Sequence, residues 1–275
     1  MVEVRPLTPS IGAEIIGADI RQEADFEIVR QAFTDHSVIA IRDQELTPDD
    51  QIEFAERFGP INVNRFFKKH DTHPKVALVL KEADQSKAIG EQWHTDHSYD
   101  DEPAMCSILH AIETPPVGGD TVFASMSAAY EALSDKFAEM IDGLNAWHSS
   151  RHVFGAAAAD SENSKTGRIE NPALAKQDAL HPVVITHPLS GRKGIYVNPE
   201  FTTRIDGWTE AESASVLRFL YEHCAKPDFH CRVSYRPGTV TMWDNRATWH
   251  KAINDYAGHR RLMHRITVEG CSLNR

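Results

Sequence analysis

The chain has 275 residues, of which 41% are hydrophobic and 25% are charged, and its net charge is -11. This is the composition of a globular protein with a sizeable core, and the acidic balance argues against a nucleic-acid-binding protein, which needs a basic face. The chain has no basic-then-apolar leader, no apolar run of membrane-spanning length and no CxxC pair among its four cysteines. We therefore expect a cytoplasmic protein that does not bind a membrane. From its net charge we also expect that it does not bind nucleic acid.

In the first part of the chain, short apolar segments bounded by turn signals predict strands over residues 2–7, 13–20 and 37–43. Apolar residues at helical spacing predict helices over 25–36 and 125–144. Another helix is expected to begin at Thr47, which is followed by Pro48 and two acids, and to end before Gly59 and Pro60. Further strands are expected at 107–113 and 120–125.

The second half of the chain predicts more strands than helices. A capping box formed by Thr209 and Glu212 predicts a helix over 209–224. The expected strands lie at 182–188, 193–198, 231–236, 239–245 and 262–270, with a hairpin-like turn at 188–194. Because helices are inserted between strands without regular alternation, the sequence favours a mainly β protein with flanking helices, an antiparallel barrel or sandwich.

The whole chain, 1–275, is expected to form a single domain with one long irregular segment. Residues 155–180 lack periodicity and are rich in small and polar residues. Long loops in compact domains are often functional lids, so this segment is interpreted as a mobile lid. An inserted segment without a role is the alternative.

Histidines and carboxylates gather in the segment EQWHTDHSYDDEP, residues 91–103. His94 and Asp96 are two apart, so on a strand both would lie on one face, while His97 would face away. A histidine and a carboxylate suit a divalent metal, and a second histidine would complete the 2-His-1-carboxylate arrangement of non-haem iron oxygenases. Among the 15 histidines, His250 is the best candidate, whereas His110 and His264 are interpreted as structural.

Arg261 and Arg265 are four apart on a predicted strand, so their side chains are expected on one face. Burying two guanidinium groups is costly unless anions meet them, and arginine suits bidentate binding of carboxylate or sulfonate groups. An exposed strand edge or internal pairing with Asp or Glu would explain the two arginines as well.

Four motifs in order, WHTD at 93–96, GGDTVFAS at 118–125, WDNRATWH at 243–250 and HRRLMHR at 259–265, resemble the taurine dioxygenase and 2,4-dichlorophenoxyacetate dioxygenase family. These are Fe(II)- and 2-oxoglutarate-dependent oxygenases. The resemblance covers nearly the whole chain. It implies a double-stranded β-helix, or jelly-roll barrel, flanked by helices, and a homo-oligomer, either a dimer or a tetramer.

The resemblance also implies roles for particular residues. His94, Asp96 and His250 match the iron ligands, and Thr121 and Arg261 match the residues that bind the 2-oxoglutarate cosubstrate. Arg265 matches the arginine that binds the organic substrate, and Asn64 stands where the taurine enzyme has a histidine. The remaining residues expected to line the substrate pocket are aromatic: Tyr99, Phe154 and Phe201.

The implied reaction uses Fe(II), 2-oxoglutarate and dioxygen to hydroxylate a small anionic organic substrate, releasing succinate and carbon dioxide. The aromatic pocket residues favour a substrate resembling an aryloxyalkanoate, whose hydroxylated product can undergo C–O cleavage. An oxygenase for alkyl sulfonates or sulfate esters is the alternative within the family. Two other classes stay open, a non-catalytic metal-binding sensor of a small acid and a zinc hydrolase.

Overall fold

An eight-stranded sheet dominates the computed structural model, which describes residues 2–158 and 160–275. Strands follow one another in the order β1-β2-β3-β14-β6-β16-β4, and β5 pairs with β16. All pairs are antiparallel except the parallel pair of β2 and β3. The eight strands are β1 (Glu3–Pro6), β2 (Ala13–Ile16), β3 (Val38–Ile41), β4 (Ile61–Asn62), β5 (Ala77–Lys81), β6 (Cys106–Glu113), β14 (Val240–Asp244) and β16 (Arg261–Val268).

Three smaller sheets complete the β structure. They have the orders β13-β7-β15, β12-β8-β9 and β10-β11. Their strands are β7 (Thr121–Ser125), β8 (Asn145–Ser149), β9 (Asp178–Pro182), β10 (Val184–Thr186), β11 (Lys193–Ile195), β12 (Thr202–Ile205), β13 (His230–Val233) and β15 (Thr248–Ala252). The protein is therefore of mixed α and β structure, and within the described residues the strand pairings form four separate sheets.

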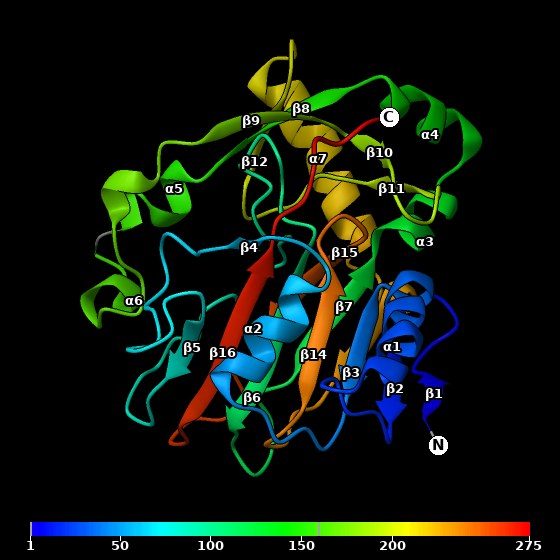
Figure 1. Cartoon of the computed structure of the whole chain (residues 1–275). Coiled ribbons are helices and arrows are strands. Elements are labelled where there is room, and N and C mark those ends of the chain that lie inside the picture. The colour runs from blue at the N-terminus through cyan, green and yellow to red at the C-terminus, as the bar shows by residue number, and fades with distance from the viewer. Residues whose placement is uncertain (1, 159) are drawn as a thin grey trace.

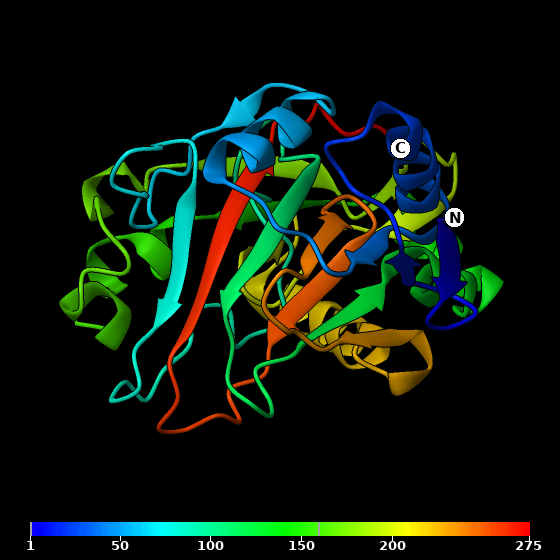
Figure 2. The same cartoon turned by 60° about the horizontal axis from the view of Figure 1, so that its bottom comes forward.

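Helices lie outside the sheets, with α1 (Glu23–His36) and α2 (Pro48–Glu56) over one face of the largest sheet (Figures 1 and 2). The expected cap of α2 is confirmed, because Thr47 forms a capping box with Asp50. The same motif begins α7 (Glu210–Cys224) at Thr209, as expected.

The single helix expected over 125–144 is wrong. The segment forms α3 (Met126–Glu131) and α4 (Asp135–Asp142), because Ser134 adopts an extended conformation between them as the N-cap of α4. Serine favours such a position over a helix interior.

The segment 155–180 contains short helical turns where none was expected. The elements in and beside it are α5 (Arg151–Phe154), η1 (Ala156–Ala158), α6 (Glu162–Lys165) and η2 (Pro172–Leu174). Backbone hydrogen bonds join the segment to residues 66–68, from Lys68 N–H to the Arg168 carbonyl and from Glu170 N–H to the Phe66 carbonyl. Its mobility stays a prediction.

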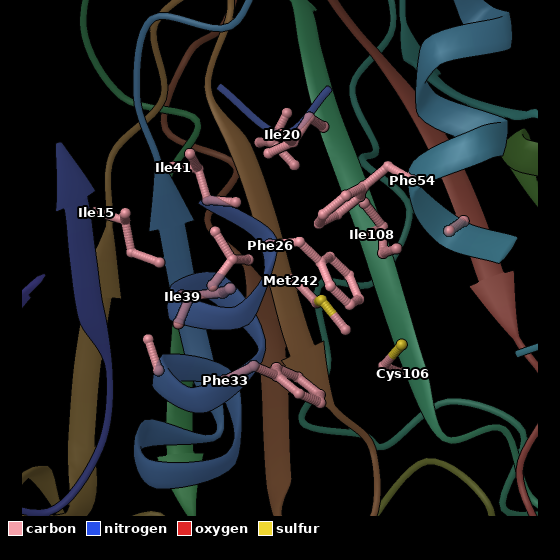
Figure 3. Close-up of a cluster of buried hydrophobic side chains, with 14 of the residues drawn as sticks. Ile15, Ile20, Phe26, Phe33, Ile39, Ile41, Phe54, Cys106, Ile108 and Met242 are labelled. Atoms are coloured by element: carbon pink, nitrogen blue, oxygen red, sulfur yellow. The ribbon is translucent and has the colours of Figure 1, made fainter. Parts of the chain in front are cut away.

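Alternate residues of the central strands pack against α1 and α2 in the main hydrophobic cluster. This follows from the two-residue period of a strand, which sends every second side chain to one face. Figure 3 shows part of this cluster between α1 and the sheet: Ile15, Ile20, Phe26, Phe33, Ile39, Ile41, Phe54, Cys106, Ile108 and Met242.

Replacing Phe54 by alanine is expected to lower the free energy of unfolding by about 3–5 kcal/mol. Phe54 is 2% exposed, and its ring lies 5.2 Å from that of Phe58 and 6.3 Å from that of Phe26, so the substitution leaves a cavity with little room to relax. Urea unfolding followed by circular dichroism measures the change. The control is Phe219→Ala, because Phe219 is 44% exposed; equal losses for the two variants would contradict the prediction.

All four cysteines are free, and Cys106, Cys224 and Cys231 are buried while Cys271 is exposed. Burial raises the pKa of the Cys224 and Cys231 thiols, so these two are neutral side chains of the interior. Among the described residues, no helix has both the length and the apolar character needed to cross a membrane.

Candidate metal centre

Two distant segments bring His94, Asp96 and His250 together. The backbone of His94 forms two hydrogen bonds with that of His250, of 3.1 and 2.8 Å, which hold the 91–99 segment against β15. One potential ligand atom from each of the three side chains lies within 4.8 Å of the others, and all three residues are buried. The expected spatial cluster is therefore present.

The local structure around the cluster differs from the expected strand. Only His94 makes a bridge, and residues 96–99 form a turn. Because His97 has a φ of 58°, in the left-handed region, the chain changes direction directly after Asp96. His97 consequently lines the same cavity as Asp96, so the expectation that it faces away is wrong.

The donor atoms are oriented for a shared cation. Nδ1 of His94 lies 2.8 Å from the Gln92 carbonyl. A carbonyl only accepts hydrogen bonds, so Nδ1 carries the proton and the Nε2 lone pair is free for a metal. Nε2 of His94 lies 3.7 Å from Asp96 Oδ1, and Nε2 of His250 lies 3.8 Å from Asp96 Oδ2. These separations are too long for direct hydrogen bonds, and two imidazoles with one carboxylate fit a first-row divalent metal.

Asp96 is held by two further side chains. Its Oδ2 accepts a hydrogen bond of 2.8 Å from the Ser107 hydroxyl and forms an ion pair of 2.8 Å with the Arg265 guanidinium. Burial alone would raise the pKa of Asp96, but Arg265 and the neighbouring histidines hold that pKa well below its ordinary value. The carboxylate is therefore ionised, with Oδ1 free for a cation. Burial, followed by the proximity of His94, lowers the pKa of His250, which keeps this imidazole neutral, as metal binding requires.

Two adjoining cavities open beside the metal centre. They share His94, Arg265, Phe67, Ile89 and Gly90 in their walls. Gly90 has a φ of +79°, and a Cβ there would lie 3.1 Å from His94 Cε1. A side chain at this position would therefore press on a candidate metal ligand.

The smaller cavity is lined by Thr121, His250 and Arg261. Arg261 is 4% exposed, and its Nε donates to the Gly119 carbonyl at 3.1 Å. Gly119 has a φ of +72°, and a Cβ there would lie 3.3 Å from Arg261 Cδ. The absence of a side chain at Gly119 thus leaves space for Arg261. The Thr121 hydroxyl accepts a hydrogen bond of 3.1 Å from the Tyr235 hydroxyl.

All five residues expected to bind the organic substrate line the larger cavity: Asn64, Tyr99, Phe154, Phe201 and Arg265. The ring of Phe201 lies 4.9 Å from that of Tyr99 and 5.9 Å from that of Phe154. Asn64 Oδ1 accepts hydrogen bonds from the N–H groups of residues 66 and 67, each of 2.9 Å. This cavity is thus apolar on one side and charged at the metal centre.

The two arginines of β16 have different partners. Both are buried and on one face, as expected. Arg265 pairs internally with Asp96, which was one of the alternatives. Arg261 has no carboxylate partner among the residues described, and its Nη2 has no hydrogen-bond partner either. Sequence reasoning missed Ser107, since a single serine in a predicted strand carries no signal of its contact.

A family model, curated relatives and solved structures each match nearly the whole chain. Residues 3–267 match the family model described as taurine catabolism dioxygenase TauD, TfdA family. The chain is 32% identical to an alkylsulfatase of Acinetobacter baylyi, over 98% of this chain and 85% of that protein. It is 33% identical to an alpha-ketoglutarate-dependent 2,4-dichlorophenoxyacetate dioxygenase of Burkholderia sp. (strain RASC), over 90% of this chain and 86% of that protein. The crystal structure of a taurine dioxygenase from Burkholderia xenovorans matches with a TM-score of 0.81 and 31% identity, covering 98% of this chain and 91% of that chain.

Proposed function

Because the chain belongs to the TauD, TfdA family of taurine catabolism dioxygenases, it is an alpha-ketoglutarate-dependent dioxygenase, and we propose that it hydroxylates a small anionic substrate resembling an aryloxyalkanoate. The observation that carries the proposal is the pair of cavities that meet at the His94–Asp96–His250 centre. The smaller cavity contains Arg261, which has no carboxylate partner in the described parts of the chain, and the larger cavity combines Arg265 with aromatic side chains.

His94, Asp96 and His250 are proposed to hold Fe(II). Bound iron would supply the oxidation in which dioxygen and alpha-ketoglutarate (2-oxoglutarate) convert a substrate C–H bond to C–OH, with release of succinate and carbon dioxide. The protein's residues orient the reactants. A hydrogen bond fixes the His94 tautomer, and a hydrogen bond from Ser107 together with the Arg265 ion pair holds the Asp96 carboxylate. Such outer partners tune ligand orientation and basicity.

Thr121 and Arg261 are proposed to bind 2-oxoglutarate in the smaller cavity. A guanidinium fork matches a carboxylate bidentately, and Arg261 Nη2 is buried without a hydrogen-bond partner within the described structure. The Thr121 hydroxyl already accepts from Tyr235, so its own proton is free to donate to a carboxylate oxygen.

The larger cavity is proposed to bind the organic substrate. Arg265 supplies a positive charge beside the metal centre, and Tyr99, Phe154 and Phe201 supply an aromatic wall for an apolar body. Hydroxylation at the carbon next to an ether oxygen gives a hemiacetal-like product, which breaks into a phenol and an oxo acid. This pairing of anionic end and aryl body supports the aryloxyalkanoate class.

Alkyl sulfonates and sulfate esters form the second candidate class. The Acinetobacter baylyi relative is an alkylsulfatase, and a guanidinium group binds a sulfate oxygen as well as a carboxylate. The dioxygenase assignment decides against the sensor and the zinc hydrolase left open by the sequence.

We also propose that the four sheets form the double-stranded β-helix barrel of this family as a single domain. The taurine dioxygenase structure with a TM-score of 0.81 supports it. The dimeric or tetrameric state and the cytoplasmic location stay predictions, and light scattering on the purified protein would determine the first.

Anaerobic protein loaded with Fe(II) and 2-oxoglutarate is expected to develop a visible metal-to-ligand charge-transfer band. Addition of a productive anionic substrate should shift the band, since substrate binding changes the iron environment. Under air, the same sample should form succinate. Absence of the band in protein with measured bound iron would overturn the proposed cosubstrate site.

The substrate class is tested by comparing kcat/KM for 2,4-dichlorophenoxyacetate, taurine and an alkyl sulfate. The proposal expects the phenoxyacetate to give the highest value, with phenol and succinate formed in equal amounts. A higher value for the alkyl sulfate or for taurine would assign the enzyme to the second class.

A further inference from the structure

Lys81 is a buried lysine without an anionic partner among the residues that the structure describes. It is the last residue of β5 and is 2% exposed. Its Nζ has no hydrogen-bond partner anywhere in the described parts of the chain. Fully buried lysines are rare unless paired, so this position requires an explanation.

The strand pairing of Lys81 places it on the same face of the sheet as residues that line the smaller cavity. In the antiparallel pairing of β5 with β16, Lys81 is directly opposite Arg261, and Val79 is opposite Met263. Residues directly opposite each other project from the same face of a sheet. Val79 lines the smaller cavity together with Arg261. Lys81 therefore projects from the cavity face of the sheet, level with Arg261.

Two buried cationic residues are consequently directly opposite each other on paired strands. Arg261 is 4% exposed and, like Lys81, has a buried nitrogen without a partner within the structure as described. The chain has 40 acidic residues and a net charge of -11, yet none of the described carboxylates meets either head group. Charges taken out of water without a counterion are strongly unfavourable. The arrangement indicates an anionic ligand.

Tyr256 covers the lysine but does not neutralise it. Lys81 Nζ lies 4.5 Å from the centre of the Tyr256 ring, and Tyr256 is 3% exposed. A cation–π contact stabilises an ammonium group, but the ring supplies no negative charge and the three N–H donors of lysine still lack acceptors.

We propose that Lys81 is a second cation for the distal carboxylate of 2-oxoglutarate and acts beside Arg261. The inference rests on the proposed function, because it places 2-oxoglutarate in the smaller cavity. Arg261 would supply the planar fork and Lys81 a point charge on the other side of the same carboxylate. The two cations would thereby favour a dicarboxylic 2-oxo acid over a monocarboxylic one.

The experiment compares two ligands that differ at one end. 2-Oxoglutarate has a distal carboxylate, and 2-oxovalerate has a methyl group in its place. Dissociation constants of both are measured by isothermal titration calorimetry on anaerobic, Fe(II)-loaded protein, for the wild type, Lys81→Met and Lys81→Arg. Lys81→Met is expected to weaken 2-oxoglutarate binding about tenfold, as loss of a charged hydrogen bond does, and to leave 2-oxovalerate binding unchanged. Lys81→Arg, which keeps the charge, should restore most of the preference.

The outcomes separate this inference from the function on which it rests. A wild type that does not prefer 2-oxoglutarate over 2-oxovalerate would overturn the proposed cosubstrate site. If the wild type shows the preference, an unchanged ratio of the two dissociation constants in Lys81→Met would overturn the role of Lys81 alone. If that unchanged ratio came with weaker binding of both ligands, Lys81 would have a purely structural role.

Thermal unfolding provides an independent test of the role of Lys81. Without ligand, Lys81→Met is expected to have a higher Tm than the wild type, because an uncompensated buried charge is removed. Addition of 2-oxoglutarate should then raise the Tm of the variant less than that of the wild type. A lower ligand-free Tm with an undiminished 2-oxoglutarate response would contradict the proposal.

Discussion

Replacement of Asp96 by alanine is expected to reduce succinate formation to background and to weaken metal binding strongly. Asp96 supplies the single carboxylate of the metal centre, and its Oδ1 is free because Ser107 and Arg265 both bind Oδ2. Without it, the two imidazoles remain beside the buried Arg265 guanidinium with no anionic ligand, and the positive charge of Arg265 opposes binding of a divalent ion. Succinate formation under air and iron content after desalting measure the two effects.

Folding must be checked in the same variant. Removing one member of a buried ion pair costs about 3–5 kcal/mol of stability, so a thermal scan should show a lower Tm but a folded protein at the assay temperature. Asp101→Ala is the matched control, because Asp101 is exposed and lies in the same segment. Full succinate formation by Asp96→Ala would show that the metal centre is assigned to the wrong residues.

Local signals predicted helix starts well. The capping box expected at Thr209 is present, and the helix start expected at Thr47 is confirmed, with a capping box to Asp50, because such signals involve only residues within one turn. The break at Ser134 was missed, since the apolar spacing continues across it while a single residue changes conformation. Strand β5 was missed as well. Its sequence ALVLK resembles many short apolar segments, and its assignment depends on pairing with the distant β16.

The parts of the functional site that depend on residue spacing within one segment were predictable from the sequence. Two arginines four apart on a strand must share a face, and Arg261 and Arg265 do. No spacing rule joins His250 to His94, so His250 was selected among 15 histidines by its place after a predicted strand, and the family resemblance supported that choice. The pair of Arg265 with Asp96 joins two segments that the fold brings together, and the left-handed φ of His97 depends on the turn after Asp96. Neither was predictable from local sequence.

Arg261→Ala is expected to raise the KM for 2-oxoglutarate by about 10- to 100-fold, the equivalent of losing a charged hydrogen bond worth about 1.5–3 kcal/mol. Water that enters the space left by the buried guanidinium would supply no positive charge, and Thr121 would remain as the neutral donor at that end of the cavity. KM for the organic substrate should change little, because the larger cavity is lined by Arg265 and not by Arg261.

The neighbouring Arg260 provides a matched control for this prediction. It is ion-paired with Glu82 and Glu113 outside the cavity, so Arg260→Ala should leave the KM for 2-oxoglutarate unchanged. Arg261→Lys should fall between wild type and alanine, since lysine keeps the charge but loses the planar fork. If Arg261→Ala altered only the KM for the organic substrate, the roles of Arg261 and Arg265 would be reversed. An unchanged KM for both would remove Arg261 from substrate binding altogether, and the unpartnered cations on this face would then require a different anion.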